Sequence, residues 1–268
     1  MFHSVFLGRI LLLTLVLVAG CGLLPEKYDE TRGWSAQKLY SEARGELADG
    51  NYEKAIKLYE TLESRYPYGR YAQQSQLDVA YAYYKDRQTA SAVAACDRFI
   101  KLHPNHAAVD YAYYLKGLAN FNEDLGFMGN LSGQDMSERD PKALLESYDA
   151  FRDLSLRYPN SKYTPDAIAR MTYLLNSLAS HEVAVARYYY KRGAYIAAAN
   201  RGQNTLTRYP RAPANEEALV IMAMSYDKLG LVDLRDDAER VLVKNFPDTA
   251  YKLGGNPYRK WWQIWNIE

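Results

Sequence analysis

The chain has 268 residues, and its 33 Lys and Arg residues nearly balance its 32 Asp and Glu residues. This near-zero net charge argues against a nucleic-acid-binding protein, because such proteins need a concentrated positive surface for the phosphates. The length allows one or two globular domains or one repeat array, each with ample chain for a core.

The first element is an amino-terminal apolar segment. Its uninterrupted part runs only from Ile10 to Ala19, which is too short for a bilayer span of roughly 20 residues. Arg9 precedes it and the small residues Ala19 and Gly20 follow it, in the layout of a secretory signal. We therefore expect residues 1–20 to be a signal peptide.

Cys21 directly follows this segment. Val18-Ala19-Gly20-Cys21 resembles the bacterial lipobox, which is cut before the cysteine. The resemblance implies a covalent lipid on Cys21, as a diacylglycerol on the sulfur and an acyl chain on the new amino terminus, and several acyl chains hold a protein durably to one leaflet. Gly22 stands where sorted lipoproteins retained at the inner membrane carry aspartate, so the expected location is the periplasmic face of the outer membrane. A plain signal peptide that happens to contain a cysteine is the alternative.

Residues 21–34 are expected to be the lipidated cysteine and a linker. Once Cys21 is modified, Cys96 has no partner for a disulfide, since the chain has two cysteines. Cys96 lies in a helical pattern near Ala94, Ala95 and Phe99. We interpret it as a small buried apolar residue.

A short phrase that ends in proline recurs along the rest of the chain. Its prolines are Pro67, Pro104, Pro159, Pro210 and Pro247, at intervals of 37, 55, 51 and 37 residues. Between them, apolar residues recur three and four apart, which is typical of helices.

The first unit shows how each repeat is built. Leu39, Ala43 and Leu47 share one helical face, Gly50 interrupts the pattern, and the stretch 50–62, "GNYEKAIKLYETL", continues it towards Pro67. Such a helix pair with small residues at the crossing is the tetratricopeptide (TPR) signature. The sequence predicts an all-α fold, an α-solenoid of about five TPR-like helix pairs after a lipoprotein signal peptide.

Units one to three are predicted to occupy residues 35–160. The third unit is split by a glycine-containing polar stretch at 122–140, which predicts a loop. Residues 165 to about 192 contain no Gly breaker or internal Pro, so we expect one long helix there. It would separate units one to three from units four and five at 161–250.

Residues that could carry chemistry are sparse. His103 and His106 flank Pro104 without a partner at metal-ligand spacing, and no phosphate loop, nucleophile elbow or H-E-x-x-H pattern occurs. The adjacent pairs Glu216-Glu217 and Asp236-Asp237 are interpreted as solvated surface. We expect no metal, no dissociable cofactor and no enzymatic activity.

Tyrosine is unusually frequent, with 25 residues. Most lie at repeat positions where they would wedge between helices. The remainder would face the concave side that stacked helix pairs create, where aromatic rings with hydroxyl groups suit peptide binding.

Several long motifs resemble one family in particular. They are Arg65–Tyr84 (RYPYGRYAQQSQLDVAYAYY), Asp97–His106 (DRFIKLHPNH), Arg139–Pro141 (RDP), Arg157–Ala167 (RYPNSKYTPDA) and Tyr188–Arg201 (YYYKRGAYIAAANR). These motifs are similar to those of the BamD/ComL family of TPR lipoproteins in the β-barrel assembly machinery. The resemblance implies an outer-membrane location and binding to the POTRA domains of a BamA-like barrel subunit. It also implies contacts with BamC- and BamE-like lipoproteins and with unfolded outer-membrane proteins that end in an aromatic segment.

The resemblance also implies site residues. Tyr66, Tyr68 and Tyr71 match the family's client-binding turn, although Arg70 stands where a proline is usual, and an interhelical wedge is the alternative for Tyr66. Arg201 matches the surface that the family uses towards BamA, with a merely solvated arginine as the alternative.

Residues 251–268 form a tail with Trp261, Trp262 and Trp265. If helical, it would gather these rings on one side. It could cap the last repeat, or it could anchor a partner or the membrane interface.

The resulting hypothesis is a non-enzymatic scaffold that holds BamA and an unfolded client together. The alternative is a TPR lipoprotein of a different envelope complex, such as a secretion pore or a peptidoglycan tether.

Overall fold

The computed structural model describes residues 29–121, 141–249, 251–252 and 256–257. Within these ranges the chain forms helices in succession and one short pair of strands. They are α2 (Ala36–Ala48), α3 (Tyr52–Arg65), α4 (Arg70–Lys85), α5 (Thr89–Leu102), α6 (Val109–Phe121), α8 (Pro141–Arg157), α9 (Thr164–Lys191), α10 (Tyr195–Arg208), α11 (Asn215–Lys228), α12 (Val232–Asn245), β1 (Tyr251–Lys252) and β2 (Asn256–Pro257).

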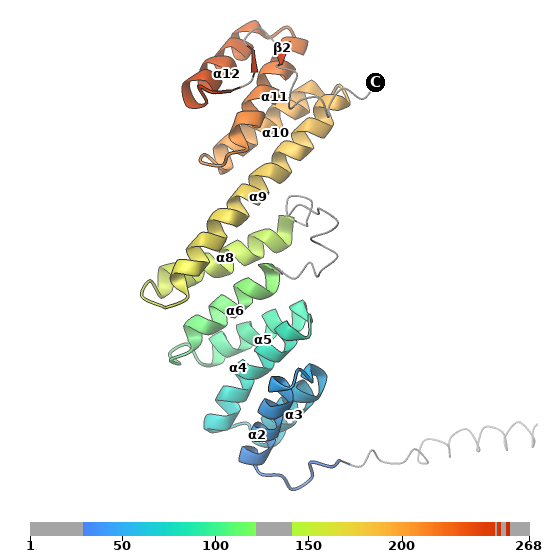
Figure 1. Cartoon of the computed structure of the whole chain (residues 1–268), viewed down its shortest axis with the longest axis vertical. Helices are drawn as coiled ribbons and strands as arrows, with labels where there is room; N and C mark the ends of the chain where they lie inside the picture. Colours follow the sequence, from blue (N-terminus) through green and yellow to red (C-terminus); the bar gives the residue numbers. More distant parts are fainter. Residues whose placement is uncertain (1–28, 122–140, 250, 253–255, 258–268) are drawn as a thin grey trace, which may run out of the picture.

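These helices form five consecutive pairs, α2–α3, α4–α5, α6–α8, α9–α10 and α11–α12, and each pair also packs on the next. Figure 1 shows the pairs stacked into one elongated array from α2 to α12. The predicted α-solenoid of about five TPR-like pairs is confirmed.

In the four pairs whose connecting turn the structure describes, the turn contains one residue with positive φ. Gly50, Gly193 and Gly230 have φ of 81°, 75° and 71°, in the region that glycine adopts without steric cost. Arg87 holds the same place between α4 and α5, with φ of 61°, and an L side chain is strained there. The interruption predicted at Gly50 is confirmed.

The repeated prolines end the second helix of each pair. The residue before a proline is driven out of the α region by the proline ring. Tyr66, His103, Tyr209 and Phe246 accordingly cap their helices with φ between −129° and −132° and ψ between 56° and 70°. The recurring phrase therefore marks one structural event, the exit from a helix.

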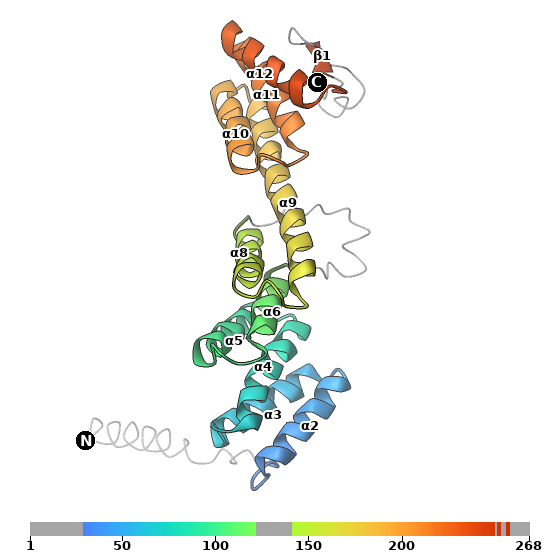
Figure 2. The same ribbon diagram turned by 90° about the vertical axis from the view of Figure 1, so that its left-hand side faces the viewer.

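The long helix predicted from residue 165 is confirmed as the 28-residue α9. At 1.5 Å per residue it is about 42 Å long. It packs on α8 at one end and on α10 and α11 at the other, as Figure 2 also shows. The division into units at 35–160 and 161–250 stays a prediction.

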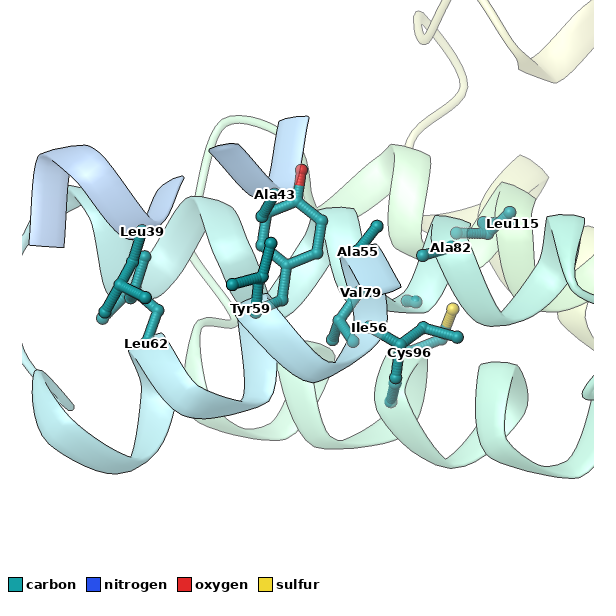
Figure 3. Packing of buried hydrophobic residues seen from close by; sticks show 14 residues of the cluster. Leu39, Ala43, Ala55, Ile56, Tyr59, Leu62, Val79, Ala82, Cys96 and Leu115 are labelled. Atoms are coloured by element: carbon teal, nitrogen blue, oxygen red, sulfur yellow. The ribbon is translucent and has the colours of Figure 1, made fainter. Parts of the chain in front are cut away.

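The core runs along the stack rather than collecting in one centre. In the first cluster the alanines Ala43, Ala55 and Ala80 are fully buried, so that helices approach closely, and Leu39 and Leu62 fill the remaining space. Figure 3 shows Tyr59, Val79 and Cys96 within this cluster. Cys96 is completely buried, as expected, and burial raises the pKa of its thiol to about 12.

Several predicted features lie outside the described residues: the signal peptide with Cys21, the loop at 122–140, and the tryptophans of the tail. Of residues 251–268 the structure describes only β1 and β2, which pair antiparallel with Tyr251 opposite Pro257. Over the described ranges, none of the helices has both the length and the apolar character needed for crossing a bilayer.

Candidate functional site: an aromatic turn and an arginine surface

The turn between α3 and α4 carries the three tyrosines predicted to bind clients. Tyr66 caps α3 through its backbone N–H, which donates to the Leu62 carbonyl. Gly69 precedes α4 as its N-cap residue, with φ of 98°, a conformation that favours glycine. The chain between them continues neither helix, and residues 66–70 are exposed.

The structure gives these three tyrosines different environments. Tyr68 is 91% exposed. The Tyr66 hydroxyl donates to the Trp34 carbonyl at 2.8 Å, and its side chain is 36% exposed. The hydroxyl of Tyr66 is therefore tied to the backbone just before α2 while its side chain stays partly exposed, whereas the ring of Tyr68 faces solvent.

Tyr71 is half-buried and packs into the first core cluster. Its ring centroid lies 5.4 Å from that of Tyr40 on α2. Arg70 lies over the Tyr71 ring at 4.8 Å from its centroid and donates to its hydroxyl at 3.0 Å. The arginine that replaces the usual proline thus fixes Tyr71 by a cation–π contact.

A half-buried carboxylate on the helix that follows this turn was missed from the sequence. Asp78 on α4 accepts hydrogen bonds from the Tyr40 hydroxyl at 2.8 Å and from the Gln74 amide at 3.0 Å. Burial raises the pKa of Asp78, and burial together with the Asp78 charge raises the pKa of Tyr40 to about 12. The one available signal was an acidic residue within the apolar stripe of α4.

Tyrosine contacts continue along the first helices of the later pairs. Tyr111 on α6 lies 5.4 Å from Tyr163, and Tyr114 stacks on Tyr163 with centroids 4.8 Å apart. The Tyr114 hydroxyl donates to Asp166 at 2.7 Å. These rings join neighbouring helix pairs, which supports the interpretation of most tyrosines as wedges.

Arg201 lies on α10, towards the other end of the solenoid from the α3–α4 turn (Figure 1). Its Nη1 donates to Glu182 Oε2 on α9 at 2.9 Å, and its side chain is 42% exposed. The bond to Glu182 raises the pKa of Arg201. Arg201 is therefore paired within the solenoid while its side chain stays partly exposed, and its role towards a partner stays a prediction.

Glu217 corrects the prediction that Glu216 and Glu217 are solvated surface. Arg187 on α9 donates to Glu217 Oε1 on α11 through Nε at 2.7 Å and through Nη2 at 2.5 Å. Burial raises the pKa of Glu217. The pair ties the long helix to the last unit, which residue spacing within α11 could not reveal.

The predicted histidine pair is part of the packing. Nε2 of His103 lies 2.8 Å from Gln76 Oε1, and both His103 and His106 contact the Phe99 ring. The part of the chain that the structure describes holds no cluster of three or more side chains able to bind a metal.

A polar cleft of about 610 Å³ opens between α3, α4 and α5. Glu60 accepts a hydrogen bond from Tyr83, and Glu63 pairs with Arg98 at 3.4 Å. Its charged groups are thus satisfied within the solenoid. The site residues therefore present binding surfaces and no arrangement of nucleophile and base.

Comparisons with known proteins agree with this description. Residues 33–241 match the family YfiO, described as outer membrane lipoprotein. A relative from Neisseria meningitidis serogroup B, named outer membrane protein assembly factor BamD, is 50% identical over 95% of this chain and 96% of its own. A relative of the same name from Neisseria gonorrhoeae is 51% identical over 88% of this chain and 89% of its own. A third relative of that name, from Vibrio cholerae, is 38% identical over 87% of this chain and 96% of its own.

Proposed function

The chain belongs to the YfiO family of outer membrane lipoproteins, and on that basis we propose that it is a scaffold for the assembly of outer-membrane proteins. Its relatives are named assembly factors, and the chain is a non-enzymatic scaffold like them. We propose further that it joins an unfolded client to a BamA-like barrel subunit. Both events are binding steps, with no bond made or broken.

The proposal depends mainly on one observation: two surfaces of different chemistry lie towards opposite ends of one continuous stack. The α3–α4 turn presents Tyr68, which is 91% exposed, beside the partly exposed Tyr66. Tyrosine supplies a large contact area with few rotatable bonds, together with a hydroxyl for backbone groups. This turn suits an extended polypeptide with an aromatic end.

The second surface surrounds Arg201. Because Glu182 already pairs with the guanidinium, the partly exposed side chain of Arg201 is oriented before a partner arrives. A guanidinium binds carboxylates through paired, charge-assisted hydrogen bonds. We propose that it contacts the POTRA domains of the BamA-like subunit, with BamC- and BamE-like lipoproteins as further partners.

A lipid on Cys21 would confine the scaffold to the periplasmic face of the outer membrane. Confinement to a thin layer raises the effective concentration of two partners that bind one scaffold. A rigid solenoid adds a fixed separation between the two binding surfaces. Client capture would then favour delivery to the barrel subunit without any chemical step.

The test is capture of the lipidated protein from gently solubilised envelopes, followed by identification of the chains that accompany it. Tyr68→Ala should lower the recovery of unfolded barrel clients and leave the recovery of the barrel subunit unchanged. Tyr188→Ala, at a tyrosine that is 54% exposed on α9, is the matched control. Tyr66→Phe keeps the ring and removes only the bond to Trp34.

Arg201→Ala should lower the recovery of the barrel subunit and retain clients. Arg240→Ala is its control, because Arg240 is also paired with a carboxylate, Asp237, at 2.6 Å on the same half of the chain. Arg201→Lys retains the charge and tests the paired geometry. Recovery of a secretion pore or of cell-wall material, with no POTRA-bearing barrel, would contradict the proposal.

A further inference from the structure

Residues 29–34, which precede α2, have a defined conformation of their own. Asp29 accepts hydrogen bonds from the Thr31 N–H at 3.0 Å and from the Thr31 hydroxyl at 2.6 Å. The N–H groups of Arg32 and Trp34 donate to the carbonyls of Asp29 and Thr31, each at 3.0 Å. These residues therefore form two overlapping turns, and we call residues 29–34 the collar.

Two adjacent side chains at the end of α3 hold the collar. Arg65 donates through Nη1 to the Thr31 carbonyl at 2.6 Å, and its Nη2 pairs with the Asp29 carboxylate. The Tyr66 hydroxyl donates to the Trp34 carbonyl at 2.8 Å. These contacts connect residues that are 32 to 36 positions apart in the sequence. They join the collar directly to the turn between α3 and α4.

The arginines at the same place in the proline phrases of units three and four have different contacts. Arg157 lies over the Tyr113 ring at 5.9 Å from its centroid, and Arg208 lies over the Tyr209 ring at 5.8 Å. Both contacts are with aromatic rings of the helix pairs, whereas Arg65 binds a backbone carbonyl and a carboxylate of the chain that precedes the first pair. Holding the collar is thus a property of Arg65 and not of the repeated phrase.

The contact is suited to fixing the path of the chain rather than to stabilising the fold. A guanidinium holds a carboxylate and a carbonyl through separate N–H groups in a fixed geometry. The Arg65 side chain is 29% exposed and that of Asp29 is 48% exposed, so water screens the pair and it adds little to the free energy of unfolding. Removing Arg65 should therefore release the collar and leave the solenoid folded.

The collar shortens the chain that separates Cys21 from the solenoid. Asp29 follows Cys21 by eight residues, whereas Ser35, the N-cap of α2, follows it by fourteen. At 3.3–3.6 Å per residue, the greatest reach is about 28 Å to Asp29 and about 48 Å to Ser35. With the collar held, the chain from Cys21 meets the solenoid at the α3–α4 turn.

We propose that Arg65 is a positioning residue, which fixes the collar to the α3–α4 turn and so keeps this turn close to the membrane. The lipid anchor then lies within about 28 Å of the collar. This restricts the turn to a thinner layer and raises its effective concentration towards partners in the membrane. The distance to the membrane rests on the proposed lipid on Cys21, and its use rests on the proposed function. The contact between Arg65 and the collar rests on neither.

The first test measures hydrogen exchange of the collar in the full-length lipidated protein in lipid nanodiscs. Arg65→Met removes both contacts and retains most of the apolar stem. We expect the N–H groups of Arg32 and Trp34 to lose protection in this variant. Lys54→Met is the matched control, because Lys54 lies on the same helix and also pairs with a carboxylate, Glu46, at 2.5 Å. It should keep the protection of the parent.

Two further variants keep the test decisive if Arg65→Met perturbs α3. Asp29→Ala changes a residue outside the helices and should also lower the protection of the collar. Arg65→Lys keeps a charge for Asp29 but loses the paired geometry, so it should restore the protection only in part. Far-ultraviolet circular dichroism checks that helix content is unchanged.

The second test measures the distance from the turn to the membrane. A dye on Ser64→Cys, at an exposed position of α3, transfers energy to dyes on the nanodisc lipids, in a Cys96→Ala background that leaves one thiol for labelling. Arg65→Met and Asp29→Ala should lower the transfer, because the longer reach lets the turn move away from the lipid. Lys54→Met should leave the transfer as in the parent.

Each outcome decides for or against the proposal. The proposal is wrong if Arg65→Met leaves both the protection and the transfer unchanged, or if Lys54→Met lowers them equally. It is also wrong if mass spectrometry finds no lipid on Cys21, because no distance to the membrane would then be fixed. If both tests succeed and envelope capture recovers neither client nor barrel subunit, the proposed function fails while the role of Arg65 holds.

Discussion

Gly117 offers a sharp test of how α6 and α8 pack. A Cβ added there would lie 2.6 Å from Cδ1 and 2.7 Å from Cζ of Phe151. The Gly117 carbonyl also accepts a hydrogen bond from Ser147 at 2.9 Å, which fixes the two backbones close together. Because Phe151 is fully buried, its ring has no open space into which it could move.

The magnitude follows from two opposing terms. Overpacking at this contact should cost about 3 kcal/mol, the upper end for inserted methyl groups. Replacing Gly by Ala within a helix stabilises the folded state by about 1 kcal/mol, because the unfolded chain loses backbone entropy. We therefore expect Gly117→Ala to lower the free energy of unfolding by about 2 kcal/mol.

Gly45→Ala is the matched control. Gly45 also lies inside a helix, α2, but an added Cβ would have no neighbour within 4 Å. It should raise the free energy of unfolding by about 1 kcal/mol, because only the entropic term remains. The two variants carry the same chemical change and should move stability in opposite directions.

The assay is urea unfolding followed by circular dichroism, with the slope m compared between variants, because an unchanged m shows that the same surface is exposed. The reasoning would be refuted if Gly117→Ala matched or exceeded the parent in stability. It would also fail if Gly45→Ala were destabilised as much as Gly117→Ala, since steric contact would then not distinguish the two positions.

Four further outcomes follow from the structure. Burial raises the pKa of Asp78 in the folded protein above the ordinary 3.8, so the parent should lose stability as the pH rises above that value. In urea unfolding between about pH 4 and about pH 7, the stability of Asp78→Asn relative to the parent should therefore increase with pH. A stability difference that does not change with pH would contradict this. Glu217→Gln should cost about 1–2 kcal/mol in urea unfolding by weakening the bond from Arg187, whereas Glu216→Gln should stay within about 0.5 kcal/mol; equal effects would contradict the assigned pairing. Because burial raises the pKa of Cys96 to about 12, its thiol should resist a thiol reagent in the native protein and react in urea, and fast native labelling would oppose this. Arg87→Gly should raise stability by up to about 1 kcal/mol, measured as the urea midpoint, since glycine accepts the φ of 61° without strain; a lower midpoint would show that the Arg87 side chain contributes more than its backbone costs.

The sequence by itself determined the repeat of helix pairs and the residues at which helices end. The prolines that end each unit act through local sterics on the preceding residue, and Gly50 supplies a φ that other residues adopt with strain. Such effects extend over one or two residues, so they can be read from the order of residues alone. The uninterrupted helical pattern after Pro165 likewise predicted α9, and the long motifs predicted the family.

Only the tertiary structure decided what the polar and aromatic side chains contact. Tyr66, Tyr68 and Tyr71 lie within six residues, yet one bonds to Trp34, one faces solvent and one is fixed by Arg70. Asp78 joins Tyr40, which lies 38 residues away, and Glu217 joins Arg187 across 30 residues. The physical reason is that local backbone sterics fix where each helix begins and ends, whereas the neighbours of a side chain depend on how distant helices pack.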